Sequence, residues 1–75
     1  MISLFKKKQT ESILETILND GWNRIDDLSF QKGRFFLELS DEHRQWNIID
    51  TGSHVRICGN YNDLKDGLIQ VNKYN

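Results

Sequence analysis

The sequence predicts a small α+β domain, in which a four-stranded antiparallel meander sheet carries an N-terminal and a C-terminal helix on one face (α-β-β-β-β-α). In the middle of the chain, short segments alternate apolar and polar residues and are separated by turn signals, as half-buried antiparallel strands are. Apolar residues at helical spacing lie before and after these segments. Two amphipathic helices and a one-sided sheet bury their apolar surfaces most simply in two layers.

The first predicted element is a helix. Its apolar residues recur on one helical face, and they are Ile13, Leu14, Ile17 and Leu18. Ser12 has capping-box spacing to Glu15, but Ser3 or Thr10 could cap an earlier start. We therefore expect the helix to begin between Ser3 and Thr10. It should end at Asn19, because Gly21 can adopt the left-handed conformation that follows many helices.

Four strands are predicted next, near Asn23–Phe30, Arg34–Ser40, Arg44–Asp50 and His54–Cys58. Short turns at Lys32–Gly33, Asp41–Glu42 and Thr51–Gly52 join them. With these turns, Phe30 lies opposite Phe35, and Ile48 lies opposite Val55. A register slip of two residues would keep every side chain on its face, whereas a slip of one would turn an apolar set toward solvent.

The alternation along the strands assigns residues to the two faces of the sheet. The face toward the helices receives Leu28, Phe30, Phe35, Leu37, Leu39, Trp46, Ile48, Val55 and Ile57, with Asp26 near an edge. The open face receives Ile25, Asp27, Ser29, Phe36, Glu38, Gln45, Asn47, Ile49, His54, Arg56 and Cys58.

The last predicted element is a second helix. Gly59 and Asn60 interrupt the strand pattern, and Asn60 or Asn62 can cap a following helix. Its apolar stripe consists of Tyr61, Leu64, Leu68 and Val71. Gly67 lies inside this helix and is expected to weaken it by roughly 1 kcal/mol relative to alanine.

Length and composition restrict the class of protein. The 75 residues predict one domain over the range 1–75. Ten Lys and Arg against eleven Asp and Glu give a net charge of −1, without the basic excess of a general nucleic-acid-binding surface. A single cysteine fits a reducing compartment. No secretory signal or membrane-spanning stretch is visible, so we expect a soluble, cytoplasmic protein.

The side chains that could bind a metal, His43, His54 and Cys58, are not expected to meet at one point. His54 and Cys58 are four residues apart on one strand, about 13 Å, so they cannot share a zinc ion. His43 lies at the end of the third strand that is far from His54, so it cannot supply a further ligand beside His54. The predicted register places Gln45, and not a histidine, opposite Cys58, so the thiol has no general base. We therefore expect no metal site and no cofactor.

No catalytic group is predicted either. The acidic residues come in the adjacent pairs Asp26–Asp27 and Asp41–Glu42, and adjacent strand residues point to opposite faces. The glycines are scattered singly, as turn residues are, and form no phosphate-binding loop. The sequence therefore predicts a protein that is not an enzyme.

The open face is the predicted functional surface. Phe36 and Ile49 are large apolar residues surrounded by polar ones, which is typical of an interaction patch. The alternative is a solvated face that tolerates two apolar side chains. We expect a small protein that binds another protein or a second copy of itself, in the manner of an inhibitor, immunity-type protein or adaptor. The predicted partner-binding residues are Phe36, Glu38, Gln45, Asn47, Ile49, His54 and Arg56.

A second hypothesis is nucleic-acid binding. It would use a basic run near the N-terminus and arginines of the strands, namely Lys6, Lys7, Lys8, Arg34 and Arg56. The open face offers a single aromatic residue for stacking, Phe36, and also carries Asp27 and Glu38. The first eight residues are too short to anchor the chain to a membrane.

Overall fold

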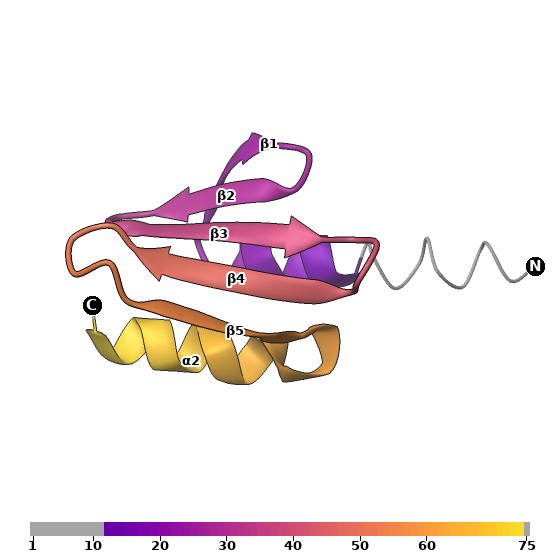
Figure 1. Ribbon diagram of the computed structural model, residues 1–75. Coiled ribbons are helices and arrows are strands. Elements are labelled where there is room, and N and C mark those ends of the chain that lie inside the picture. Colours follow the sequence, from indigo (N-terminus) through magenta and orange to yellow (C-terminus); the bar gives the residue numbers. More distant parts are fainter. Residues whose placement is uncertain (1–11, 75) are drawn as a thin grey trace, which may run out of the picture.

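The computed structural model describes residues 12–74. The predicted helix start between Ser3 and Thr10 and the Lys6–Lys8 run lie outside the described residues. The elements are an N-terminal helix described over residues 12–19, β1 (Asn23–Asp26), β2 (Ser29–Lys32), β3 (Phe35–Ser40), β4 (Gln45–Asp50), β5 (Arg56–Asn60), the 3-10 helix η1 (Tyr61–Asp63) and α2 (Leu64–Tyr74) (Figure 1).

The sheet is antiparallel and has the order β1-β2-β3-β4-β5. This confirms the predicted antiparallel meander, but the predicted number of four strands is wrong. The segment Asn23–Phe30 is not one strand, because the chain turns back at Asp27 and Leu28. The Leu28 N–H donates to Asp26 Oδ1 at 3.2 Å, and the Arg24 guanidinium donates to the Asp27 carbonyl at 2.8 Å. These local side-chain bonds close a turn that contains no glycine.

The register of two hairpins differs from the prediction by two residues. Phe30 pairs with Leu37 instead of Phe35, and Ile48 pairs with Ile57 instead of Val55. In the β2–β3 hairpin, Gly33 is the first loop residue and has φ +59, a position where such loops favour glycine. Because the slip is even, every strand side chain of these hairpins keeps its predicted face.

Three residues predicted at strand starts, Arg34, Arg44 and His54, belong to turns instead. Arg44 ends the β3–β4 turn with φ 50, and His54 lies in the β4–β5 turn with φ 63. Both values lie in the left-handed region, which is incompatible with a strand. Consequently β4 begins at Gln45 and β5 begins at Arg56. At its other end, β5 continues through Gly59 and Asn60, so the predicted strand end at Cys58 is wrong.

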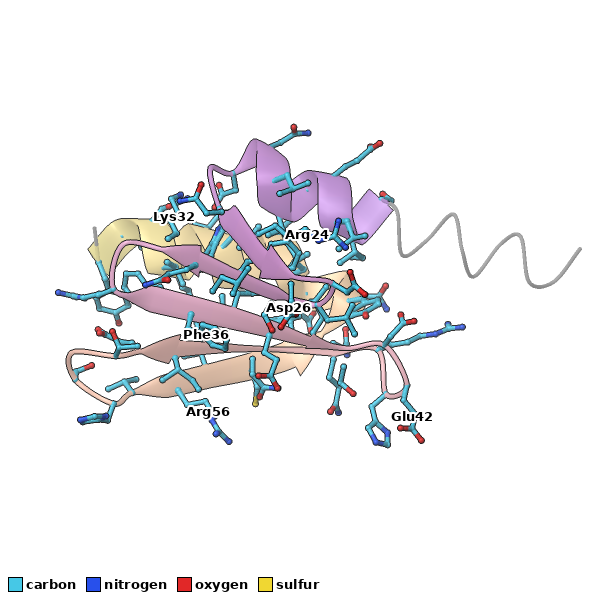
Figure 2. All side chains as sticks on the ribbon, turned by 90° about the horizontal axis from the view of Figure 1, so that it is seen from above. Arg24, Asp26, Lys32, Phe36, Glu42 and Arg56 are labelled. Carbon is cyan, nitrogen blue, oxygen red and sulfur yellow. The ribbon has the colours of Figure 1, made fainter. Side chains whose placement is uncertain are left out.

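The N-terminal helix and α2 lie on the same face of the sheet, as predicted, and form the second layer (Figures 1 and 2). The buried core contains Ile17, Trp22, Phe30, Phe35, Leu37, Leu39, Trp46, Ile48, Tyr61, Leu64, Leu68 and Val71, with Leu28 and Ile57 partly buried against it. Val55 was predicted to be buried but is 58% exposed, because the register slip moves it beyond β5. Trp22 was not predicted in the core, since it lies between a helix and a strand, outside both periodicities.

The end of the N-terminal helix and the start of the C-terminal helical segment follow the sequence signals. The N-terminal helix ends at Asn19, and Gly21 has φ +95, as predicted. Asn60 caps η1, because its side chain accepts from the Asn62 N–H at 3.0 Å. The Tyr61 hydroxyl donates to Asp41 at 3.3 Å, and burial together with this carboxylate raises the pKa of Tyr61 to about 12.

Trp46 is packed between two glycines. A Cβ placed on Gly59 of β5 would lie 2.8 Å from the Trp46 Cζ2 atom, and one on Gly67 of α2 would lie 2.6 Å from it. Gly67 therefore does more than weaken the helix, because it makes room for the indole.

Over residues 12–74, we find no helix with the length and apolar character needed to cross a membrane.

Candidate functional site

The sheet face opposite the helices, here called the open face, is crossed by two rows of directly paired residues. One row contains Asn23, Gln31, Phe36, Ile49 and Arg56. The other contains Asp26, Ser29, Glu38, Asn47 and Cys58. Asp26 was predicted on the helix side, but the bulge in β1 brings it beside Ser29. Figure 2 looks onto this face, with Asp26, Phe36 and Arg56 coming from β1, β3 and β5.

The structure brings most of the predicted partner-binding residues together. Those on the open face are Phe36, Glu38, Gln45, Asn47, Ile49 and Arg56. His54 is the exception, because it lies in the β4–β5 turn and not on a strand. No helix or strand of the described range 12–74 covers this face (Figures 1 and 2).

Phe36 and Ile49 form the centre of the open face. They are direct cross-strand partners on β3 and β4, and both are half-buried. Such an aromatic–aliphatic pair stabilises a sheet by about 0.2–1 kcal/mol relative to two alanines. The pair is therefore structural in part, while its remaining exposed surface is available for contact.

Charged residues of both signs lie around this centre. Arg56 and Glu38 are exposed, and within the described part of the chain neither forms an ion pair. Asn47, which lies between Glu38 and Cys58 in its row, is half-buried. The open face thus combines an apolar centre with a polar, charged rim.

The arginines of the nucleic-acid hypothesis lie on different faces. Arg34 belongs to the β2–β3 turn, where its Nε is 3.1 Å from Asp50 Oδ2 and its Cζ is 5.2 Å from the centroid of the Phe35 ring. Its charge is balanced on the helix side, whereas Arg56 lies on the open face. The two arginines therefore do not form one basic surface.

A hollow of about 300 Å³ lies on the helix side, between the β4–β5 turn and the end of α2. It is lined by Arg34, Phe35, Ile48, Asp50, Ser53, Val55, Ile57, Val71 and Tyr74. Sequence reasoning missed this hollow because it placed Val55 in the core. Val55 and Tyr74 are 58% and 70% exposed at its mouth.

Asp50 is the acidic residue in the lining of this hollow. Burial raises the pKa of its carboxyl, but hydrogen bonds from the Gly52 N–H and from Ser53, together with the nearby Arg34 charge, outweigh burial and lower the pKa overall. The ionised carboxylate thus holds the β4–β5 turn closed. The Asp50 carboxylate is already bonded to Gly52, Ser53 and Arg34. The surface that remains in the hollow is therefore mainly apolar.

Within residues 12–74, no three His, Cys, Asp or Glu side chains gather in a group that could hold a metal ion. Cys58 is exposed on β5 and pairs with Asn47, two residues along β4 from the predicted Gln45. His43 and His54 lie in the turns at opposite ends of β4.

Comparisons with protein-family models, curated proteins and solved structures find no match for this chain.

Proposed function

We propose that this chain is a small, non-enzymatic protein that binds another protein through the open face. The supporting observation is the half-buried Phe36–Ile49 pair at the centre of a five-stranded surface, with exposed Arg56 and Glu38 beside it. An apolar centre inside a polar rim is the usual anatomy of a protein–protein interface. Aromatic residues and arginines are the usual anchors of such interfaces.

The shape of the surface favours a macromolecule over a small ligand. Small ligands bind in concave sites that enclose most of their surface, and the open face is the broad side of a sheet. A partner would also add stability, because a chain of 75 residues builds only a small core. An inhibitor, immunity-type or adaptor role is compatible with this size and mode of contact.

Site-specific photo-crosslinking tests the proposal. A photoreactive residue replaces Glu38 on the open face of the full chain, and the matched control carries it at Gln70, which is exposed on α2. In lysate of the source cells, we expect one discrete protein adduct from position 38 that survives nuclease and is absent from position 70. Identical adducts from both positions, or none from position 38, would contradict the proposal. Loss of the adduct on nuclease treatment would favour nucleic acid as the partner.

The partner identified in this way allows a quantitative test. Phe36→Ser should weaken binding by about 2 kcal/mol or more, roughly 30-fold, as truncation of an interface anchor does. Phe36→Leu is the matched control and should retain most of the affinity. Circular dichroism confirms that both variants fold. Equal affinity of all three proteins would remove Phe36 from the interface.

A further inference from the structure

The two edge strands of the sheet differ in their protection against pairing with another strand. β1 has four residues and a bulge between Arg24 and Asp26. The Arg24 guanidinium also donates hydrogen bonds to the carbonyls of Asp26 and Asp27, at 3.2 and 2.8 Å. β5 has five residues, all in regular register with β4, and carries no lysine. Bulges and charged residues, above all lysines, are among the devices that keep an edge strand from pairing. β5 has no bulge and a single charged residue, Arg56, so it is the less protected edge.

Hydrogen bonds at the two ends of the β4–β5 ladder show which backbone groups of β5 point outward. The Tyr61 N–H donates to the Arg44 carbonyl at 3.1 Å, and the Asp50 N–H donates to the Val55 carbonyl at 2.8 Å. In an antiparallel pair, hydrogen-bonded residues alternate with residues whose backbone groups face away. The odd-numbered residues of β5 therefore bond to β4, and the even-numbered ones present their backbone groups to the edge.

The outward-facing residues of β5 are Arg56, Cys58 and Asn60, and all three are exposed. Arg56 and Cys58 each offer an N–H and a carbonyl. The Asn60 carbonyl already accepts from Trp46 Nε1 at 2.8 Å, so Asn60 offers only its N–H. Among the described strands, none lies beyond β5.

We propose that β5 pairs in antiparallel fashion with β5 of a second copy of this chain, around a two-fold axis through Cys58. Cys58 is the central residue of the strand, so this axis uses the whole of β5. Each Cys58 N–H donates to the carbonyl of the other Cys58, and each Asn60 N–H donates to the Arg56 carbonyl of the other copy. The two sheets then continue into one another.

The sequence of β5 supports a copy of itself as the occupant of this edge. With the axis at Cys58, the single charge of the strand, Arg56, lies opposite a neutral Asn60. An axis at Arg56 would oppose two cations, which is unfavourable across strands. An axis at Ile57 would pair Arg56 with Cys58 but would leave Asn60 opposite His54, whose φ of 63 keeps it out of a strand, so the ladder would be shorter. Of these three axes, the Cys58 axis alone pairs all five residues of β5 without placing like charges opposite each other.

Sedimentation velocity of the full chain under reducing conditions tests the proposal. We expect a monomer–dimer equilibrium between micromolar and millimolar concentration. Cys58→Pro should weaken dimerisation at least tenfold, because proline removes the outward N–H but no bond to β4. Cys58→Val is the matched control and should still dimerise. A chain that stays monomeric up to millimolar concentration, or a Cys58→Pro variant that dimerises like the parent, would overturn the proposal.

A further variant separates this proposal from the proposed function. Phe36→Ser alters the open face and leaves the edge of β5 intact, so it should dimerise normally even though its binding to the partner is weakened. Loss of the dimer in Phe36→Ser, with Cys58→Pro unaffected, would instead place the contact between copies on the open face and overturn the edge pairing.

Disulfide trapping tests the register and does not depend on the proline variant. In the proposed dimer the Cα atoms of the two Cys58 residues are about 5.5 Å apart, within reach of a disulfide. Diamide should oxidise the two thiols to a disulfide-linked dimer while it is itself reduced to the hydrazine. Arg56→Cys in a Cys58→Ser background is the control, because its thiols would be about 13 Å apart. Equal trapping at both positions, or trapping at neither, would contradict the register.

Discussion

At the scale of single residues, Trp46 shows how β4, β5 and α2 are held together. Its indole Nε1 donates to the Asn60 carbonyl at 2.8 Å, and its ring lies against Gly59 and Gly67. A glycine inside a helix costs about 1 kcal/mol relative to alanine. Here the missing side chain allows α2 to approach a buried aromatic ring, so local helix propensity gives way to packing.

We predict that Gly67→Ala lowers the free energy of unfolding by about 1–3 kcal/mol, because the added methyl group overpacks the Trp46 ring. Helix propensity alone predicts the opposite sign. Urea denaturation measures the change, and Gln70→Ala, on the exposed side of α2, should alter stability by less than about 0.5 kcal/mol. In a Trp46→Leu background the cost of Gly67→Ala should largely disappear. An unchanged cost there would show that the ring is not the cause.

A second prediction at this scale concerns acid stability. The pKa of Asp50 is lowered in the folded state. Its carboxylate therefore stabilises the fold fully at pH values above the ordinary aspartate pKa of about 3.9. This stabilisation is lost as the pH falls through the lower pKa of the folded state. Asp50→Asn should therefore be less stable than the parent at pH 7 and approach it in acid. Denaturation curves over this pH range test this, with Asp27→Asn as an exposed control. A gap that is independent of pH would contradict the role of the charge.

At the scale of elements, the sequence predicted faces better than boundaries. The alternation along β3 and β4 survives a two-residue slip, so Phe36 and Leu37 lie on their predicted sides. The β1–β2 hairpin was not predicted because its turn, at Asp26, Asp27 and Leu28, contains neither glycine nor proline. Side-chain hydrogen bonds close this turn instead. Hairpin register depends on backbone dihedral angles, such as the positive φ of Gly33, that periodicity does not report.

Lys32 connects three elements, and we predict that Lys32→Met lowers the free energy of unfolding by about 1–3 kcal/mol. Its Nζ donates to the Asp20 carbonyl at 2.6 Å and to Asn72 Oδ1 at 2.9 Å, and it forms an ion pair with Asp20 at 3.3 Å. Methionine keeps the aliphatic chain but removes the donor to the partly buried Asp20 carbonyl. Lys65→Met, at an exposed site on α2, is the control. Equal effects of both substitutions in urea denaturation would show that these bonds contribute nothing specific.

At the scale of the whole molecule, the same even slip explains which surface was predicted and which was not. It leaves the open face intact, so the residues around Phe36 and Ile49 come together as expected. It also moves Val55 out of the core, which opens the hollow beside Tyr74 on the helix side. The assignment of residues to the two faces survives an even register error. Which residue is the last one buried in the core, in contrast, depends on the exact register.

Stability should also be distributed unevenly over the molecule, and residue-resolved hydrogen exchange can measure this. β3 and β4 are paired on both sides and contribute buried residues such as Leu37 and Ile48, so their amides should exchange slowest. β1 is exposed at every residue and should exchange fastest among the strands.

Exchange along β5 tests the outward direction of its even-numbered residues. In dilute protein, the Ile57 and Gly59 amides should be protected by β4, whereas the Arg56 and Cys58 amides should exchange rapidly because they face the edge. Raising the protein concentration should protect the Cys58 amide selectively, since the proposed pairing gives it an acceptor. Protection of Cys58 in dilute protein would show that its N–H already has a partner within the chain. In that case, β5 could not pair with a second copy through this residue.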